Sequence, residues 1–393
     1  MILFPYAVDT RGGSVYSSFL LIEELTRRGC PAIPAFHGDG FARDLARQRG
    51  LRFVDLPALG IKAEASRKDG FRLGNLTAAP ACIKAIREHA VKLVHVNDKR
   101  MLRTWALPAR LTGRPLLAHW RSVYAPSWSV DLGLRFASRV VCVSAYSRGL
   151  LPDWAQEKSE VVYNPFQSGM DAEARDATRR RIRAEAGIPQ DAAVIGFFGS
   201  LLSRKRAHVL IKILQRLNET ADGRPVYGVL CGDVQAPRDE QYFSLLAEGG
   251  PWLERFVCPG FVNNVLEWMA ASDVMIAPAV DEPLARVGVE AQSVGLPAIV
   301  SSDGGLREVV EDGVSGLVID PHDFESWVAM VRLVLDDAAF AQRLADGGLR
   351  AAAKLTVEKH ADAVEAVYEK LLHHNSGAIA DGAVPLPHPK SVE

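Results

Sequence analysis

The sequence predicts an α/β protein made of two doubly wound domains, each with a parallel sheet covered by helices. Two observations carry this prediction. The chain of 393 residues is longer than one ordinary hydrophobic core, so two domains are expected. In both halves of the chain, short apolar runs alternate with amphipathic helical segments, which is typical of parallel sheets.

The first half begins with a strand at residues 1–8, followed by a loop and a helix at 14–29. Gly29 ends this helix, and Arg27 and Arg28 occupy its last turn, where the helix dipole favours cations. Further strands are expected at 31–36, 92–97, 114–120 and 138–145. Their apolar residues do not alternate with polar ones, which indicates strands that are buried on both faces.

The second half repeats this plan. Its strands are expected at 192–200, 225–232, 255–261, 273–280, 296–302 and 316–320. Helices are expected between them at 207–220, 239–248, 265–272 and 287–295. Three more helices follow, at about 322–336, 338–354 and 357–372.

These elements divide the chain into five segments. Residues 1–170 form the first domain, 171–190 an arginine-rich linker and entry helix, and 191–356 the second domain. The helix at 357–372 either stays with the second domain or crosses back to the first. The tail at 373–393 is rich in Gly, Ala and Pro, and we expect it to be disordered.

Composition excludes several classes of protein. The five cysteines are widely spaced and form no CxxC pair, which argues against a metal or redox site. The segment MILFPYAV lacks the basic start of a secretory signal. No apolar run approaches the ~20 residues that a membrane-spanning helix needs. We therefore expect a cytoplasmic protein without a metal.

The net charge of −1 conceals an asymmetry, because residues 1–190 carry +11 and residues 191–393 carry −12. The positive excess of the first half is either ordinary surface charge or a sign that this half faces an anion. A phosphorylated acceptor, a lipid diphosphate or an anionic membrane surface would fit the second interpretation. Nucleic acid is not expected, since the basic residues are scattered and no recognition motif accompanies them.

Two strand-to-helix turns could hold an anion. Gly12 and Gly13 follow the first strand, where glycine lets the backbone approach a ligand at a helix N-terminus. They match neither the GxGxxG fingerprint nor a P-loop, and glycine is often needed there for steric reasons alone. In the second domain, Arg204, Lys205 and Arg206 begin a helix, either as a solvated cluster or as ligands of a phosphate.

The segment EPLARVGVE, residues 282–290, carries a carboxylate at each end. Pro283 keeps Glu282 on a loop at the end of a strand, and the next helix is expected to begin near Val287. Glu290 would then lie in the first helical turn, where the dipole favours an acid. Together the loop carboxylate, the helix N-terminus and Glu290 could bind sugar hydroxyls, a diphosphate and a ribose. Alternatively, Glu282 is a surface residue and Glu290 only a partner of the dipole.

His95, His119 and Arg121 end first-domain strands, where α/β folds build their sites. A histidine at such a position is nevertheless more often structural than catalytic. Asn164-Pro165 is a turn signal in the segment VVYNPF, which closes the first domain.

Taken together, these motifs resemble the family-4 retaining glycosyltransferases of the GT-B fold, from residue 1 to about 370. The resemblance is strongest over 257–320, where Glu282 and Glu290 match the family's Glu-x7-Glu. ASDV, GLPAIVSSDGG and EDGVSGLVIDPHD follow in the family's order. GGSVYSSFLLIEELTRRG, VSAYS and VVYNPF match its first-domain segments. This fold implies two facing Rossmann-like domains with a nucleotide-sugar in an interdomain cleft.

The resemblance also implies roles. Glu282 would bind the hydroxyls of the donor sugar, assisted by backbone N–H groups near Leu284 and Ala285. Glu290 would bind the ribose, and Lys205 would neutralise the diphosphate. The loop at Gly13 would lie against this diphosphate.

Three departures from the family pattern concern the same site. The family has Arg where this chain has Ser200, and we take Arg204 as the candidate for the missing charge. The family's EPFG is here Glu282-Pro283-Leu284-Ala285, and an alanine side chain would narrow the sugar pocket.

Leu284, Ala285 and Arg286 are therefore where donor choice could differ, and Val287 is a further candidate donor-binding residue. In many relatives a histidine ends the strand that here reads PLLAHWRS, and either His119 or Arg121 takes that role.

The function that follows is a retaining glycosyltransferase, without metal or cofactor. It would move a sugar from a nucleotide donor to a glycan, a lipid-linked or a small-molecule acceptor, as in polysaccharide or lipopolysaccharide biosynthesis. We expect it in the cytoplasm or at the inner face of the membrane. Two alternatives are another GT-B enzyme, such as a nucleotide-sugar epimerase, and a catalytically degenerate partner subunit.

Overall fold

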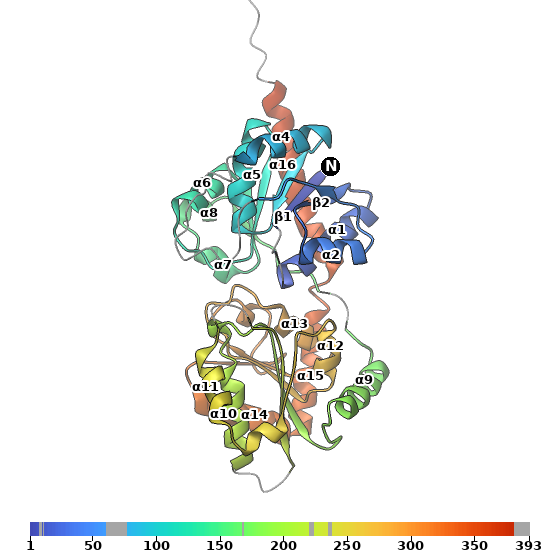
Figure 1. Cartoon of the computed structure of the whole chain (residues 1–393), viewed down its shortest axis with the longest axis vertical. Helices are drawn as coiled ribbons and strands as arrows, with labels where there is room; N and C mark the ends of the chain where they lie inside the picture. Colours follow the sequence, from blue (N-terminus) through green and yellow to red (C-terminus); the bar gives the residue numbers. More distant parts are fainter. Residues whose placement is uncertain are drawn as a thin grey trace, which may run out of the picture.

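The computed structural model describes residues 1–7, 10, 12–59, 77–166, 169–219, 224–234 and 238–373, with the last helix continuing to Ala380. Its first half forms a parallel sheet of seven strands in the order β3-β2-β1-β4-β5-β6-β7 (Figure 1). The strands are β1 Ile2–Ala7, β2 Ala32–His37, β3 Val54–Asp55, β4 Leu93–Val96, β5 Leu116–Trp120, β6 Arg139–Cys142 and β7 Ser159–Val161. The strand order reverses between β1 and β4, and α/β folds bind ligands at the carboxyl ends of such strands.

Helices cover both faces of this sheet because neighbouring residues of a strand point to opposite sides. Leu3 packs in one apolar cluster with Trp105 of α5, whereas Phe4 packs in the other with Phe19 of α1. Both clusters are fully buried, as a doubly wound sheet requires. The helices are α1 Gly13–Arg27, α2 Phe41–Gln48, α4 Ala79–Glu88, α5 Lys99–Leu111, α6 Trp128–Phe136, α7 Ala145–Gly149 and α8 Asp153–Gln156.

The second half forms a parallel sheet of six strands in the order β10-β9-β8-β11-β12-β13. The strands are β8 Ala193–Phe198, β9 Val226–Cys231, β10 Phe256–Gly260, β11 Val274–Ala277, β12 Ala298–Ser301 and β13 Leu317–Ile319. The helices are α9 Ala172–Glu185, α10 His208–Glu219, α11 Glu240–Glu248, α12 Val265–Ala270, α13 Arg286–Ser293, α14 Phe324–Asp336 and α15 Ala338–Ala352. Short 3₁₀ turns lie at η1 Ser203–Lys205, η2 Pro251–Arg255 and η3 Leu306–Glu308. The predicted pair of doubly wound domains is confirmed.

The last helix, α16 Val357–Ala380, packs on the first domain although it follows the second (Figure 1). Val364 and Tyr368 are buried in the apolar cluster of Phe4. Arg28, just after α1, holds the outer face of the helix by donating to the carboxylates of Asp362 and Glu365 and to the backbone carbonyl of Glu358. α16 runs past residue 372, so the expectation of disorder from 373 onward is wrong for 373–380. No proline before Pro385 interrupts this extension, and residues 381–393 lie outside the described part.

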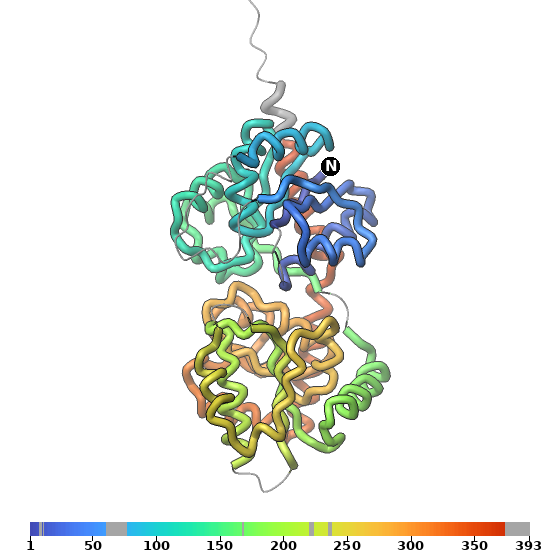
Figure 2. Tube along the Cα trace, viewed as in Figure 1, coloured from blue at the N-terminus to red at the C-terminus, as the bar shows by residue number. Residues whose placement is uncertain are grey.

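The chain crosses between the domains twice, and the crossings lie side by side (Figure 2). Phe166, at the end of the first domain, donates its backbone N–H to Leu355 O, which precedes α16, at 3.1 Å. Phe166 also pairs with Thr356 in a parallel bridge. The two chain connections between the domains therefore lie at the same place. Within the described residues, no helix is both long and apolar enough to cross a bilayer.

A candidate active site where the domains meet

Glu282 lies on the loop that follows β11, and its side chain is almost completely buried. Lys205 Nζ lies 2.8 Å from its Oε2, and Arg204 forms a second ion pair with the same oxygen. Both cations come from η1, after the neighbouring strand β8, so strand order brings the three side chains together. Burial alone would raise the pKa of Glu282, but the two cations outweigh it and hold this pKa below its usual value. Glu282 is therefore an ionised carboxylate.

Two glycines after β12 support the loop of Glu282. Gly305 donates its N–H to Glu282 O at 2.9 Å. A Cβ on Gly304 would lie 2.5 Å from the same oxygen, so only glycine allows this approach. The predicted strand-and-turn GLPAIVSSDGG thus fixes the backbone that presents Glu282.

Helix α13 begins at Arg286 with Ala285 as its N-cap and no side-chain cap. Its first N–H groups therefore have no partner from the cap side chain. The predicted start at Val287 is one residue late. Glu290 is consequently the fifth helical residue, and the expectation that it lies in the first turn is wrong. Glu290 instead pairs with Arg286, one turn earlier, at 2.8 Å.

The side chains of Leu284 and Ala285 pack in the apolar core of the second domain and are almost fully buried. Val287 is partly buried against the same cluster. A ligand could therefore contact mainly the backbone groups of Leu284 and Ala285. The idea that the alanine side chain narrows a sugar pocket gains no support from this packing.

Arg286 crosses from the second domain to the first. Its Nη1 donates to Ser17 Oγ at 2.7 Å and to Pro165 O at 3.2 Å. It passes directly over Gly13, where a Cβ would lie 2.5 Å from Arg286 Cδ. The glycine of the first-domain loop is therefore needed for close approach of the other domain.

The remaining predicted residues of the η1 region are not part of this contact. Ser200 is half-buried on the loop after β8, and its hydroxyl makes no hydrogen bond within the described part of the chain. Arg206 adopts a left-handed backbone with φ of 57° and donates to Pro321 O, away from Glu282. Of the basic triplet, Arg204 and Lys205 alone contact Glu282.

His119 and Arg121 lie together at the carboxyl end of β5. Arg121 donates from Nε to Asn97 Oδ1 at 3.2 Å and from Nη2 to His119 Nδ1 at 3.2 Å. Its Nη1 donates to Asn164 Oδ1. Burial lowers the pKa of Arg121 to about 9, which still leaves the guanidinium charged at neutral pH. Arg121 keeps part of its surface exposed to solvent, whereas His119 is buried.

A chain of buried rings leads from His119 to helix α16. His95 Nε2 lies 3.1 Å from His119 Nδ1, and His95 Nδ1 lies 2.6 Å from Tyr368 Oη. His360 stacks on His119 with ring centroids 5.8 Å apart. Burial lowers the pKa of all three histidines, that of His360 to about 3, so they are neutral. The crossing helix is thus part of the floor beneath Arg121.

Glu308 joins the domains and was missed by the sequence analysis. It accepts hydrogen bonds from the backbone N–H groups of Ala145 and Tyr146, both at 2.7 Å. Ser144 Oγ donates to Pro283 O at 2.5 Å. The predicted VSAYS segment therefore binds directly to the loop of Glu282. Asn97, Asn164, His360 and Tyr368 were also not assigned to the site. A polar residue after a strand was the only signal for the two asparagines, and the two α16 residues carried no such signal.

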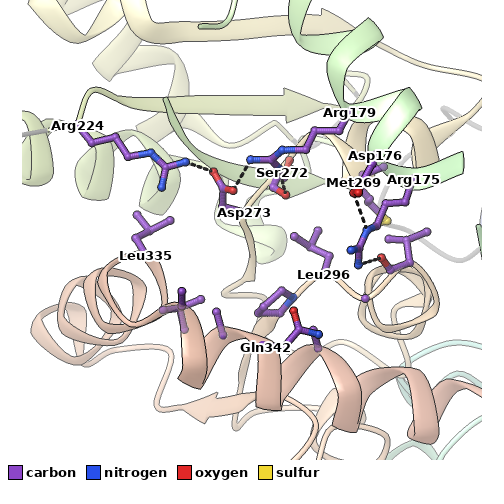
Figure 3. Close-up of a pocket in the computed structure, with 18 residues that line it drawn as sticks. Arg175, Asp176, Arg179, Arg224, Met269, Ser272, Asp273, Leu296, Leu335 and Gln342 are labelled. Atoms are coloured by element: carbon purple, nitrogen blue, oxygen red, sulfur yellow. Dashed lines mark hydrogen bonds and ion pairs between the residues drawn. The ribbon is translucent and has the colours of Figure 1, made fainter. Parts of the chain in front are cut away.

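A cavity of about 290 Å³ lies elsewhere, at the amino ends of strands β11 and β12 of the second sheet (Figure 3). Asp273 and Leu296 line it just before β11 and β12, whereas the residues above follow the carboxyl ends of strands. Arg179 and Arg224 at its wall pair with Asp273 at 2.6 and 3.4 Å. The cavity is therefore separate from the candidate active site.

Two family models match the chain. "Glycosyltransferase Family 4" matches residues 11–167, and "Glycosyl transferases group 1" matches residues 178–350. The chain is 34% identical over 208 residues to a D-inositol 3-phosphate glycosyltransferase of Nocardioides sp., covering 50% of this chain and 45% of that protein. It is 28% identical over 334 residues to D-inositol 3-phosphate glycosyltransferase 1 of Catenulispora acidiphila, covering 78% and 77%. The chain thus spans less than half the length of the Nocardioides protein.

Among solved structures, Anabaena HepE in complex with UDP and glucose superposes with a TM-score of 0.78 at 22% identity. The superposition covers 94% of this chain and 99% of that one. This likeness establishes the arrangement of the two domains. Because each family model matches one of these domains in the expected order, the chain belongs to the family-4 glycosyltransferases of the GT-B fold.

Proposed function

We propose that the protein is a retaining glycosyltransferase that moves a sugar from a nucleotide-sugar donor to a hydroxyl acceptor. The observation that carries this proposal is the buried Glu282 carboxylate, ion-paired with Lys205 and Arg204 beside the N-terminus of α13. A carboxylate is a good acceptor for sugar hydroxyls. Two cations and a helix N-terminus within one site are suited to a diphosphate.

Charge stabilisation would be the main contribution of the protein. Lys205, Arg204 and the N–H groups of α13 would hold the nucleoside diphosphate as it leaves, and this negative charge grows in the transition state. Glu282 would orient the sugar, and Glu290 would bind the ribose. The departing diphosphate oxygen would take the acceptor proton on the same face of the sugar. Such a reaction needs no pair of catalytic carboxylates and, with cations already at the diphosphate, no metal ion.

The names of the relatives support a donor and an acceptor class. HepE binds UDP and glucose, and the Nocardioides and Catenulispora proteins are named for an inositol phosphate acceptor. We therefore propose a UDP-sugar as the donor. A glycan, a lipid-linked sugar or a small polyol remain the acceptor classes to compare.

UDP binding and sugar transfer test the proposal. Titration calorimetry should show UDP binding to the full-length chain, and Lys205→Met or Glu282→Gln should abolish transfer while the far-UV circular dichroism stays native. Lys212→Met is the matched control, because Lys212 is an exposed residue of α10 outside the site. Full turnover by both site variants would refute the assigned roles. UDP binding without turnover on any acceptor would favour a degenerate subunit.

A further inference from the structure

The hydrogen bonds around Arg121 fix the protonation of the histidines below it. A guanidinium only donates, so His119 Nδ1 must accept from Arg121, and it also accepts from His95 Nε2. His119 therefore carries its proton on Nε2. His95 in turn accepts at Nδ1 from the hydroxyl of Tyr368.

The open positions in this cluster are therefore mostly donors. His119 Nε2–H is buried and has no partner among the described residues. The same holds for Asn97 Nδ2, whose orientation is fixed because Asn97 Oδ1 accepts from Arg121. Arg121 has five N–H groups, and three of its nitrogens are engaged with Asn97, Asn164 and His119. Among the ring and amide groups of this cluster that the structure describes, His360 Nε2 is the buried acceptor without a partner, since His360 Nδ1 donates to Tyr163 O.

Arg121 also has no counter-ion within the part of the chain that the structure describes. Its three hydrogen-bond acceptors are two amide oxygens and a neutral imidazole. The one arginine that is fully buried among the described residues is compensated. Arg183, which is fully buried, pairs with Asp273 at 3.0 Å and donates to Ala271 O at 2.9 Å.

The position of the cluster places it next to the donor site. Asn97 and Arg121 follow the carboxyl ends of β4 and β5, and Asn164 follows β7. The next residue after Asn164 is Pro165, whose carbonyl accepts from Arg286 at the start of α13. The charge of Arg286 is close enough to contribute to the lowered pKa of Arg121. The unfilled donors therefore lie at the domain boundary beside the candidate active site.

We propose that Arg121, with Asn97 and His119, binds a carboxylate or phosphate group carried by one of the two substrates. This inference rests on the proposed function, and it makes the substrate class anionic beyond the diphosphate itself. The group would come either from a uronic acid as the transferred sugar or from a phosphate on the acceptor. Both offer oxygens that accept several charge-assisted hydrogen bonds, which is what a donor-rich cluster requires.

A purely structural role for Arg121 makes a different prediction about stability. A structural arginine stabilises the fold, so its loss should resemble the loss of Arg183. A ligand-binding arginine without a counter-ion is retained at a cost to the unliganded protein. We therefore expect Arg121→Gln to unfold at or above the wild-type temperature. Arg183→Gln should unfold about 5 °C or more below it.

Paired ligands identify the source of the anionic group by calorimetry on the full chain. UDP-glucuronate and UDP-glucose differ only at C6, which is a carboxylate in the first and a hydroxymethyl group in the second. Inositol 3-phosphate and inositol, each added with UDP, differ only in the phosphate. In the wild type, one charged probe should bind more tightly than its neutral counterpart. Arg121→Gln should remove about tenfold or more of this preference and leave UDP affinity within about twofold. Arg121→Lys should restore part of it.

If Arg121→Gln weakens only the binding of UDP-glucuronate, the anionic group belongs to the donor. If it weakens only the binding of inositol 3-phosphate, the group belongs to the acceptor. The proposal is wrong if the wild type does not distinguish either pair, or if Arg121→Gln keeps the preference. It is also wrong if Arg121→Gln is as unstable as Arg183→Gln. Failure of the wild type to bind UDP would reject the proposed function, and the stability comparison, which needs no nucleotide, separates that result from failure of the anion site.

Discussion

Replacing Gly305 by alanine should introduce a steric clash between the domains at the loop of Glu282. A Cβ at this position would lie 2.0 Å from Pro283 O and 2.9 Å from Ser144 Cβ and Oγ. Since real Cβ atoms do not approach closer than 3.0 Å, the Pro283 carbonyl must move by about 1 Å. The backbone angles of Gly305, φ −86° and ψ −7°, suit alanine, so the contact alone causes the effect.

The displaced carbonyl also accepts the interdomain hydrogen bond from Ser144, so stability and activity should both respond. Overpacking of this kind costs about 1–3 kcal/mol, and a 1 Å misplacement of a substrate-binding group costs about 100-fold in rate. Thermal unfolding and single-turnover transfer measure the two effects. Gly149→Ala in α7 is the control, because a Cβ there meets nothing within 4 Å. Gly305→Ala with wild-type turnover would refute this reasoning.

Three further predictions concern the same boundary. Gly13→Ala should raise the donor KM several-fold, because the new Cβ meets the Arg286 side chain, which its ion pair with Glu290 and its interdomain hydrogen bonds hold in place; an unchanged KM would contradict it. Glu308→Gln removes the charge that binds two backbone N–H groups of the first domain, and small-angle scattering should show a larger radius of gyration; an identical radius would show that this contact does not hold the domains. His360→Asn should flatten the fall in melting temperature below pH 6.5, and an unchanged slope would argue against the buried neutral histidine.

The sign of the last prediction follows from the lowered pKa of His360, about 3 in the folded state. The unfolded chain takes up this proton near pH 6.5 and the folded one does not. The contribution of His360 to the free energy of unfolding is therefore fully present above about pH 6.5. Below this pH it falls by about 1.4 kcal/mol per pH unit. Replacing the histidine removes its contribution between about pH 6.5 and 3.

Local sequence predicted only part of the second-domain site. Pro283 placed Glu282 on a loop. The basic triplet could have been either a solvated cluster or a set of phosphate ligands, and the role of Lys205 followed from the family resemblance. The start of α13 was misjudged by one residue, because Arg286 is as good a helix residue as Val287. The short edge strands β3 and β7 were missed, since two or three residues carry no readable pattern.

The cluster below Arg121 could not be predicted in the same way. It joins the ends of β4 and β5 to His360 and Tyr368 of α16, more than two hundred residues away. Which polar residue after a strand faces inward depends on packing that one sequence does not reveal. The interdomain contact of Glu308 was equally hard to predict, because an acidic residue in a 3₁₀ turn is usually solvated.

The charges at the domain boundary explain why this cluster matters for function. Arg286 is compensated by Glu290, whereas Lys205 and Arg204 share the single carboxylate of Glu282. Arg121 has no carboxylate partner within the described residues. These six side chains carry four positive and two negative charges, and Glu308 adds a third negative charge at the boundary. A diphosphate at Lys205 and Arg204 would leave Arg121 as the cation on the first-domain side. A substrate that brings its own oxyanion to Arg121 would supply the anionic partner that the described residues do not.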